Sequence, residues 1–168
     1  MNLNQTIYQR LSELSAYPVI RANQNGKEPE KPFMTYEVKR DKTPEHFHYG
    51  KLDDEGKQKV SSHVESVLEL QVFGKGAVDR LRAVLLKLAT YSERLKWINA
   101  GVVIVDEGIL SNMPFLNEAQ AYEERAIMEV TIRHSVEIMD DVGYFNRVEV
   151  TDTGTSNINT IEVKNGEN

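Results

Sequence analysis

The sequence contains no cysteine among its 168 residues. A disulfide framework and a thiolate zinc site are therefore excluded, because both require cysteine sulfur. This composition fits a protein made and used in a reducing cytoplasm. No apolar run approaches the roughly 18 residues of a membrane-spanning helix, and no basic segment followed by an apolar one opens the chain. We therefore expect neither a membrane span nor a secretory signal.

The chain also lacks a concentrated basic region. Its formal net charge is −6, and acidic residues are spread along its whole length. Basic residues gather only locally, around 39–42 and 80–87, and acids stand among them. A protein that grips nucleic acid electrostatically needs a basic patch to contact the phosphates. DNA binding is therefore not expected to be the main role.

Two long stretches alternate between apolar and polar residues. From Val60 to Val72 the even positions are mostly apolar and the odd positions mostly polar, and the same period of two runs from Glu124 to Met139. A period of two is that of a β-strand with one buried face. Both stretches predict strands of an antiparallel sheet whose second face meets water or a partner.

Helical spacing of apolar residues marks three other segments. Residues 3–14 place apolar side chains at intervals of three and four, with Asn4 as the expected N-cap. The stretch 77–88 repeats this spacing, and residues 91–99 predict a short helix or turn that Gly101 would end at its C-terminus. The residues expected to be buried in the second segment are Ala77, Leu81, Val84, Leu85 and Leu88.

Together these elements predict an α+β fold, in which a small, mostly antiparallel sheet with long amphipathic strands packs against two main helices. No repeat or linker divides the chain, so we expect a single domain over 1–150. The polar tail 151–168 is expected to be flexible, or to add the strand "NTIEV" to an edge that a partner offers. Shorter strands are expected over 18–22, 33–40, 102–108 and 144–150, and loops over 23–32, 41–58 and 109–122.

A glycine corner joins the first long strand to the helix after it. Gly74 and Gly76 match the first two glycines of a dinucleotide fingerprint, but Asp79 stands at the third position. Its charge would repel a pyrophosphate, and the phosphate-loop pattern is missing as well. We interpret the corner as structural, with Asp79 favourable at a helix N-terminus. A small ligand-binding or enzymatic α/β domain with a site near Gly74–Asp79 is the alternative.

Other patterns for catalysis or metal binding are incomplete. His46 and His48 flank Phe47, but no third metal ligand is evident. His134 falls on an apolar strand face, where a hydrogen-bonded core histidine is expected. A Gly-x-Ser-x-Gly nucleophile elbow is missing, and the acid clusters do not form a calcium loop. We therefore predict no catalytic residue, no metal site and no cofactor.

Two apolar features have more than one interpretation. Trp97 and the stretch "ILSNMPFL" at 109–116 are either interface anchors or parts of the core that hold a loop in place. The sequence alone leaves both alternatives open.

The order of elements resembles the neck terminator, or tail terminator, proteins of long-tailed phages. The resemblance covers residues 1 to about 150 and depends on a strand ending in "VFGKGAVD" that feeds a helix, and on "GILSNMPFLN" leading into "YEERAIMEVTIRHSV". The strand in "DVGYFNRVEV" completes it. No single residue is diagnostic, so order and spacing carry the resemblance.

The resemblance implies a structural virion protein with a tail-terminator-like fold and no enzymatic activity. Such proteins form a six-fold ring at the neck that terminates the tail tube and joins it to the head–tail connector. The implied partners are other copies of the chain, the tail tube, the connector or adaptor proteins and, as a further candidate, the sheath. Double-stranded DNA would pass through without specific binding. The implied location is the virion neck, after assembly in the host cytoplasm.

The resemblance also suggests which residues form interfaces. The loop at 41–58 is expected to act as an arm that clasps a neighbour. Arg125 fits the start of the second long strand in the resemblance, although a plain surface arginine at a strand end is an equal alternative. The edge strand 144–150 is also a candidate. The individual residues are Phe47, Tyr49, Met113, Pro114, Phe115, Glu124 and Arg125.

Overall fold

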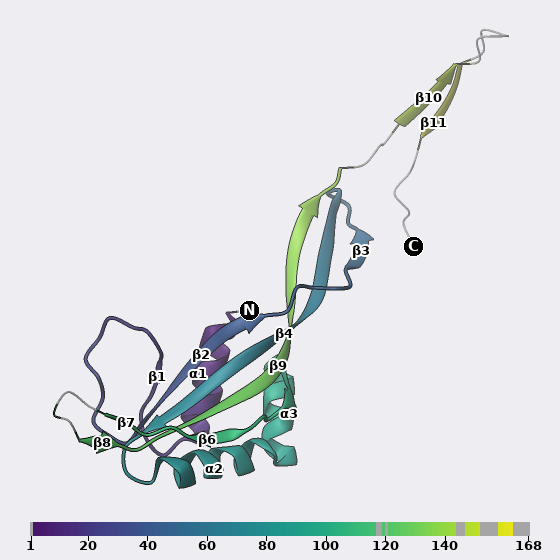
Figure 1. The fold of residues 1–168 in the computed structure, drawn as a ribbon. Helices are drawn as coiled ribbons and strands as arrows, with labels where there is room; N and C mark the ends of the chain where they lie inside the picture. The colour runs from purple at the N-terminus through teal and green to yellow at the C-terminus, as the bar shows by residue number, and fades with distance from the viewer. Residues whose placement is uncertain (1, 117–118, 120, 144–146, 152–157, 163–168) are drawn as a thin grey trace. The chain divides into compact units, whose positions relative to one another are not determined.

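The computed structural model describes residues 2–116, 119, 121–143, 147–151 and 158–162 (Figure 1). The chain forms two compact units. The first unit comprises Met1–Pro44 and His63–Ser135, and the second comprises Glu45–Ser62 and Val136–Asn168. Two long strands contribute residues to both units. The assignment of 1–150 to a single domain stays a prediction.

The sheet confirms the α+β class and its mostly antiparallel pairing. Its strands follow the order β1-β2-β4-β9-β5, and β6 also pairs with β9. The β1–β2 pair is parallel, while β2–β4, β5–β9 and β6–β9 are antiparallel. The bounds are β1 Val19–Arg21, β2 Phe33–Asp41, β4 Lys57–Phe73, β5 Val102–Asp106, β6 Leu110–Asn112 and β9 Arg125–Asp141.

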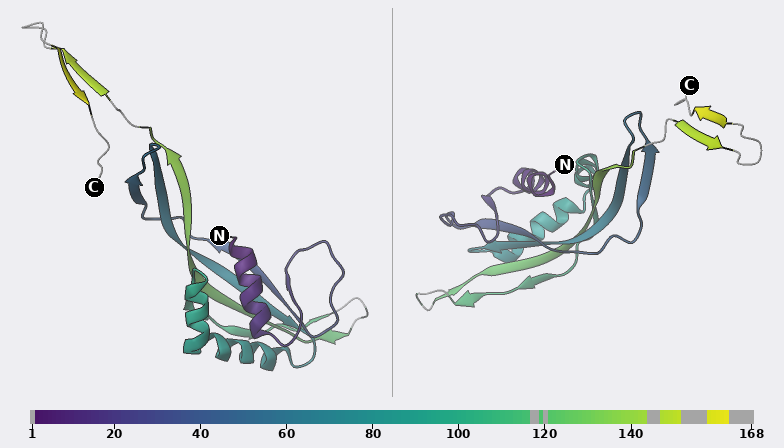
Figure 2. Two further views of the ribbon diagram at one scale, coloured as in Figure 1. Left: turned by 180° about the vertical axis from the view of Figure 1, so that it is seen from behind. Right: turned by 90° about the horizontal axis from the view of Figure 1, so that it is seen from above.

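The core of the first unit lies between the sheet and three helices, α1 Leu3–Leu14, α2 Ala77–Leu88 and α3 Tyr91–Asn99. The helices gather on the same side of the strands (Figure 2). The alternation predicted for the long strands is confirmed there, because their even positions are buried. The buried strand residues on this face include Val64, Leu68, Leu70, Val72, Ala126, Met128, Val130 and Ile132.

The two predicted main helices are confirmed, with one correction to a cap. The N-cap of α1 is Asn2, whose side-chain oxygen accepts a hydrogen bond from the backbone N–H of Gln5 at 3.3 Å. Asn4 was the wrong choice, because it already lies inside the helix. In α2 the predicted residues are buried, except that Leu85 is only half-buried.

The short helix predicted over 91–99 is also present. Thr90 caps α3 with its side chain, and Gly101 follows the helix with φ +80°. This left-handed conformation suits glycine, so the predicted C-terminal signal is confirmed. Trp97 is 1% exposed and belongs to the core. Trp97 is therefore a core residue and not an interface anchor.

The predicted loop at 109–122 was only partly right. Residues 110–112 form β6. Phe115–Leu116 form β7, which pairs with β8, Tyr122–Glu123, at the end of the predicted loop. These strands are very short and owe their existence to backbone pairing rather than to an alternating pattern. Residues 117, 118 and 120 lie outside the described part of the chain.

The second unit contains more strand than the sequence predicted. The expected loop at 41–58 includes β3, His48–Leu52, which pairs with β4 in antiparallel register. A turn joins the two strands: Asp53 accepts hydrogen bonds at its Oδ1 from the N–H groups of Glu55 and Lys57, at 3.0 and 2.8 Å. Side chains that cap a turn in this way are typical of aspartate. The prediction that the segment is exposed is confirmed for β3.

The end of the chain forms a second pair of strands. The backbone of β10, Arg147–Thr151, pairs in antiparallel register with β11, Ile158–Glu162. The strand predicted at 144–150 is confirmed for residues 147–150. Residues 144–146 lie outside the part of the chain that the structure describes. The strand in "NTIEV" therefore pairs with β10 of its own chain.

Among the described residues, no helix has the length and apolar character needed to cross a membrane.

The buried and exposed faces of α2 give a direct test of the core. Leu81 is fully buried, whereas Leu86 on the same helix is 65% exposed. We expect Leu81→Ala to lower the free energy of unfolding by about 2–5 kcal/mol, because it leaves a cavity. The matched variant Leu86→Ala should change it by less than about 0.5 kcal/mol. Urea denaturation measures both values, and equal losses would contradict the packing described.

Candidate functional site

The glycine corner before α2 is held by Glu124, the residue directly before β9. The N–H of Gly74 donates to the backbone oxygen of Glu124 at 2.9 Å, and the N–H of Gly76 donates to its carboxylate Oε2 at 2.8 Å. Gly76 itself offers no side-chain cap to the helix. The Glu124 carboxylate therefore acts as the N-terminal cap of α2, where a negative charge is favourable.

Both glycines of the corner are required by its backbone. Gly74 has φ +102° and Gly76 has φ +74°, values that side chains disfavour. A Cβ atom on Gly74 would also come within 3.0 Å of the Lys31 Cβ. These are requirements of a tight turn, as the structural interpretation of the corner predicts.

Two carboxylates occupy the position where a nucleotide phosphate would have to bind. The Glu124 carboxylate takes the N–H group of Gly76, and Asp79 follows in the first turn of α2, paired with Arg82 at 2.5 Å. Phosphate binding at a helix N-terminus needs free N–H groups and no competing negative charge. The geometry therefore gives no support to a ligand site between Gly74 and Asp79.

Arg125 holds the segment that leads into β7. Its Nε donates to the backbone oxygen of Met113 at 3.0 Å, while its own backbone oxygen accepts from the N–H of Met113 at 2.8 Å. Its guanidinium carbon lies 5.2 Å from the centre of the Phe115 ring, within the range of a cation–π contact. Arg125 is thus more than a plain surface residue, because it fixes the 113–115 segment against β9.

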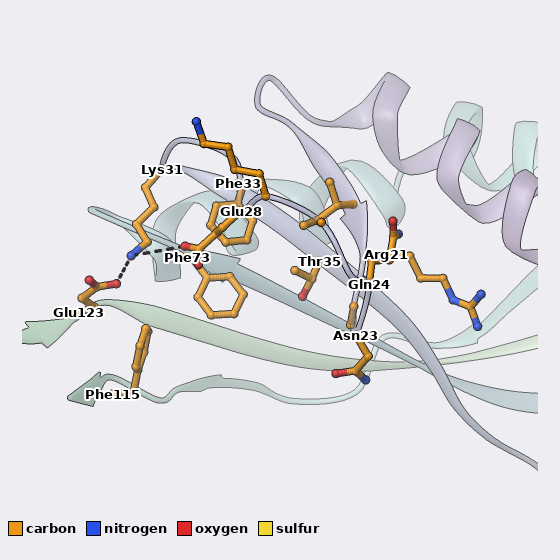
Figure 3. A pocket seen from close by; sticks show the side chains of 14 residues that line it. Arg21, Asn23, Gln24, Glu28, Lys31, Phe33, Thr35, Phe73, Phe115 and Glu123 are labelled. Atoms are coloured by element: carbon orange, nitrogen blue, oxygen red, sulfur yellow. Dashed lines mark hydrogen bonds and ion pairs between the residues drawn. The ribbon is translucent and has the colours of Figure 1, made fainter. Parts of the chain in front are cut away.

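A row of three aromatic rings continues from this point across the sheet. Phe115 meets Phe73 edge to face at 6.1 Å between ring centres, and Phe73 stacks on Phe33 at 4.9 Å. These are preferred geometries of aromatic pairs. The rings line a pocket of about 570 Å³ (Figure 3). Residues of the 20–28 segment supply another part of its wall.

Charged side chains border the aromatic pocket. Lys31 forms ion pairs with Glu123 of β8 and with Glu28, the latter at 3.6 Å (Figure 3). The hydrogen bond to Glu123 is the main reason that the pKa of Lys31 is raised. The pocket therefore combines an aromatic floor with a mixed-charge border, an arrangement that can hold an apolar side chain of a partner.

Several large apolar side chains remain exposed near this end of the first unit. We call Ile109, Met113, Leu116 and Tyr122 the hairpin end. Their exposed fractions are 81%, 48%, 55% and 80%. Pro114 is exposed too, while Phe115 is half-buried in the aromatic row. Exposed apolar side chains of this kind are candidates for contact with a partner.

The sheet face opposite the helices carries a network of ion pairs. Glu65 contacts both Lys42, at 2.6 Å, and Arg133. Hydrogen bonds from these two residues lower the pKa of the Glu65 carboxyl. Glu69, only 5% exposed, pairs with Lys39 at 2.5 Å, and that hydrogen bond raises the pKa of Lys39. The network satisfies the charges of this face internally.

The prediction for His134 is confirmed. The ring is 8% exposed, and its Nε2 lies 2.9 Å from the hydroxyl of Ser66. The residue is a hydrogen-bonded core histidine. Among the residues that the structure describes, no group of three or more His, Asp or Glu side chains is arranged to hold a metal ion.

The candidates chosen from the sequence fall into two groups. Met113, Phe115, Glu124 and Arg125 belong to the first unit and form one connected set around the glycine corner. Phe47 and Tyr49 belong to the second unit, where they are 55% and 68% exposed. The interface role of every candidate stays a prediction.

Of the residues that line the pocket, sequence reasoning chose only Phe115; it missed the other two rings, Phe33 and Phe73, and the ion pair of Lys31 with Glu123. Phe33 and Phe73 are register partners in β2 and β4. To predict that the two rings stack, one would need to know which residues of β2 and β4 lie opposite each other. The residues between the two strands do not specify this register. The signal in the sequence was an aromatic residue at one end of each strand, Phe33 in β2 and Phe73 in β4.

The comparisons with known proteins give one finding. A family model described as phage neck terminator protein matches residues 1–159 of the chain. The match covers every element from α1 to β10 and the first two residues of β11. The comparison with curated proteins gives no match.

The cap supplied by Glu124 can be tested by removing its carboxylate. Glu124→Ala should lower the free energy of unfolding by about 0.5–2 kcal/mol, because the N-terminus of α2 loses its only side-chain partner at Gly76. Glu129→Ala, five residues further along in β9, is the matched control: the Glu129 side chain is 51% exposed and its carboxylate lies 3.8 Å from Arg40. The control should cost under about 1 kcal/mol. Chemical denaturation would contradict the cap if both variants lost the same stability.

Proposed function

Because the chain belongs to the phage neck terminator protein family, we propose that it forms a six-fold ring that caps the tail tube, halts its growth and joins the tail to the head–tail connector. The family match over residues 1–159 is the observation that carries the proposal. A structural role in the phage neck, and a place in the virion, follow directly from the family. Ring formation, the six-fold symmetry and head–tail joining are the proposed steps.

The distribution of exposed apolar residues supports a ring. The hairpin end belongs to the first unit, and Phe47 and Tyr49 belong to the second. A head-to-tail ring requires two different surfaces on each subunit, one of which meets the other on the neighbour. Phe47 and Tyr49 can supply one of these two surfaces, which leaves the hairpin end available for contact with the tail tube or the connector.

The charge of the chain supports passage of DNA without binding. Each subunit carries a formal net charge of −6, so a ring of copies is strongly acidic. Basic side chains on the helix-free sheet face are neutralised by Glu65 and Glu69. A ring with this net charge repels phosphates overall, and the paired basic side chains of this sheet face are not available to bind them.

We assign Met113, Pro114, Phe115 and Arg125 to contacts with other neck proteins, and Phe47 and Tyr49 to contacts with a neighbouring copy. Arg125 and Phe115 hold the hairpin end in place, and Met113 presents its side chain. The tail tube and the connector are the expected partners, the sheath is a further candidate, and assembly takes place in the host cytoplasm.

Deletion of the gene tests the function directly. Electron microscopy of lysates from a phage without this gene should show filled heads apart from tails, and tails of irregular or excessive length. Supplying the wild-type chain from a plasmid should restore joined particles. Normal infectious particles in the deletion strain would overturn the proposal.

A surface variant tests the role of the hairpin end. Met113→Asp should abolish plasmid complementation of the deletion, because a charge placed on an apolar contact surface opposes docking. Its stability should stay within about 0.5 kcal/mol of wild type, since the side chain is 48% exposed. Tyr8→Asp on α1, also 48% exposed, is the matched control and should complement normally. Full complementation by Met113→Asp would remove the hairpin end from the interface.

A further inference from the structure

The second unit exposes large apolar side chains. Among its residues in 45–62 and 136–143, no large hydrophobic side chain is buried. Strands without a packed hydrophobic face are marginal in water, and clustered exposed apolar groups indicate a docking surface. The exposed residues are Phe47, Tyr49, Leu52, Val136, Ile138, Met139 and Val142.

Strand register separates these residues onto different faces. Lys59 of β4 and Glu137 of β9 form an ion pair at 2.5 Å, so they lie on the same face. Because successive side chains of a strand alternate, Val60, Val136 and Ile138 lie on the opposite face. Tyr49 is the register partner of Val60 and Leu52 that of Gln58, which places both on this second face. We call Tyr49, Leu52, Val60, Val136 and Ile138 the arm face.

A helix of the first unit carries a second uncovered apolar surface. Tyr91, Leu95 and Ile98 of α3 are 81%, 42% and 51% exposed. Their spacing of four and then three residues places them on one side of the helix, while Trp97 is buried on the side that faces the core. We call these three residues the α3 stripe.

Charge distinguishes the α3 stripe from the hairpin end as a partner for the arm face. The described residues of the second unit in 45–62 and 136–143 include seven acids and three bases, a net charge of −4. The segment 75–99, which contains α2 and α3, has six bases and two acids, a net charge of +4. The segment 106–124 around the hairpin end has five acids and no base. An acidic arm is attracted to the first segment and repelled by the second.

We propose that the arm face of one subunit packs on the α3 stripe of a second copy of this chain. The inference rests on the proposed ring and identifies the two surfaces that join its subunits. The contact is head-to-tail, because the arm face and the α3 stripe are different surfaces, and repeated contacts of this kind close into a ring. It covers the apolar side chains of β3 and β9 that are exposed in the single chain.

Disulfide trapping tests the contact, and a chain without cysteine gives it a clean background. A chain carrying Ile98→Cys and Ile138→Cys is supplied to the deletion phage, and purified particles are oxidised. Both positions are more than half exposed, so the substitutions leave the core intact. A non-reducing gel probed for this chain should show multimers up to the size of the ring. The control pairs Ile109→Cys, 81% exposed at the hairpin end, with Ile138→Cys and should remain monomeric.

The outcomes separate this contact from the function on which it rests. Multimers in the 98–138 variant alone support the proposal. Multimers in the 109–138 control alone, a faster-migrating monomer linked within itself, or no link while the chain is present in particles each overturn it and leave the neck function standing. Particles that form normally without the chain overturn the proposed function, and the subunit contact with it.

Discussion

Burial of one face of β4 and β9 under three helices is the interaction on which the rest of the first unit depends. Both strands place alternate apolar residues against α1, α2 and α3, and this shared core sets their register as well as their faces. A slip of one residue would expose Leu68, Leu70, Met128 and Ile132 at once. With the register fixed, Glu124 meets Gly76 and Arg125 meets Met113. The glycine corner and the hairpin end are therefore held by the same core.

The features that the sequence revealed are those with a period or a local signal. Alternation from Val60 to Val72 predicted most of β4, and the spacing of Leu81, Val84 and Leu88 predicted the buried side of α2. His134 could be assigned to the core because its position continues the apolar face of β9. In each case the determining contacts repeat within a few residues of the chain.

The features that the sequence did not reveal depend on distant partners. β3 forms because its backbone meets β4, and β6 forms because it meets β9. Neither segment has a pattern of its own that predicts a strand. The cap of α2 comes from Glu124, 48 residues away in the sequence. The predicted N-cap of α1 was Asn4, whereas the structure has Asn2 in this position. Even a local capping signal can therefore misplace a helix boundary by about half a turn.

The pairing of the two longest strands also has a mechanical consequence. β4 and β9 contain 17 residues each and are neighbours in the sheet. Force applied along paired strands loads their hydrogen bonds together in shear, whereas force across them would open the bonds one after another. In the proposed ring, each chain would carry tension whenever head and tail are pulled apart. Paired strands of this kind resist such tension without a disulfide, which a chain without cysteine cannot form.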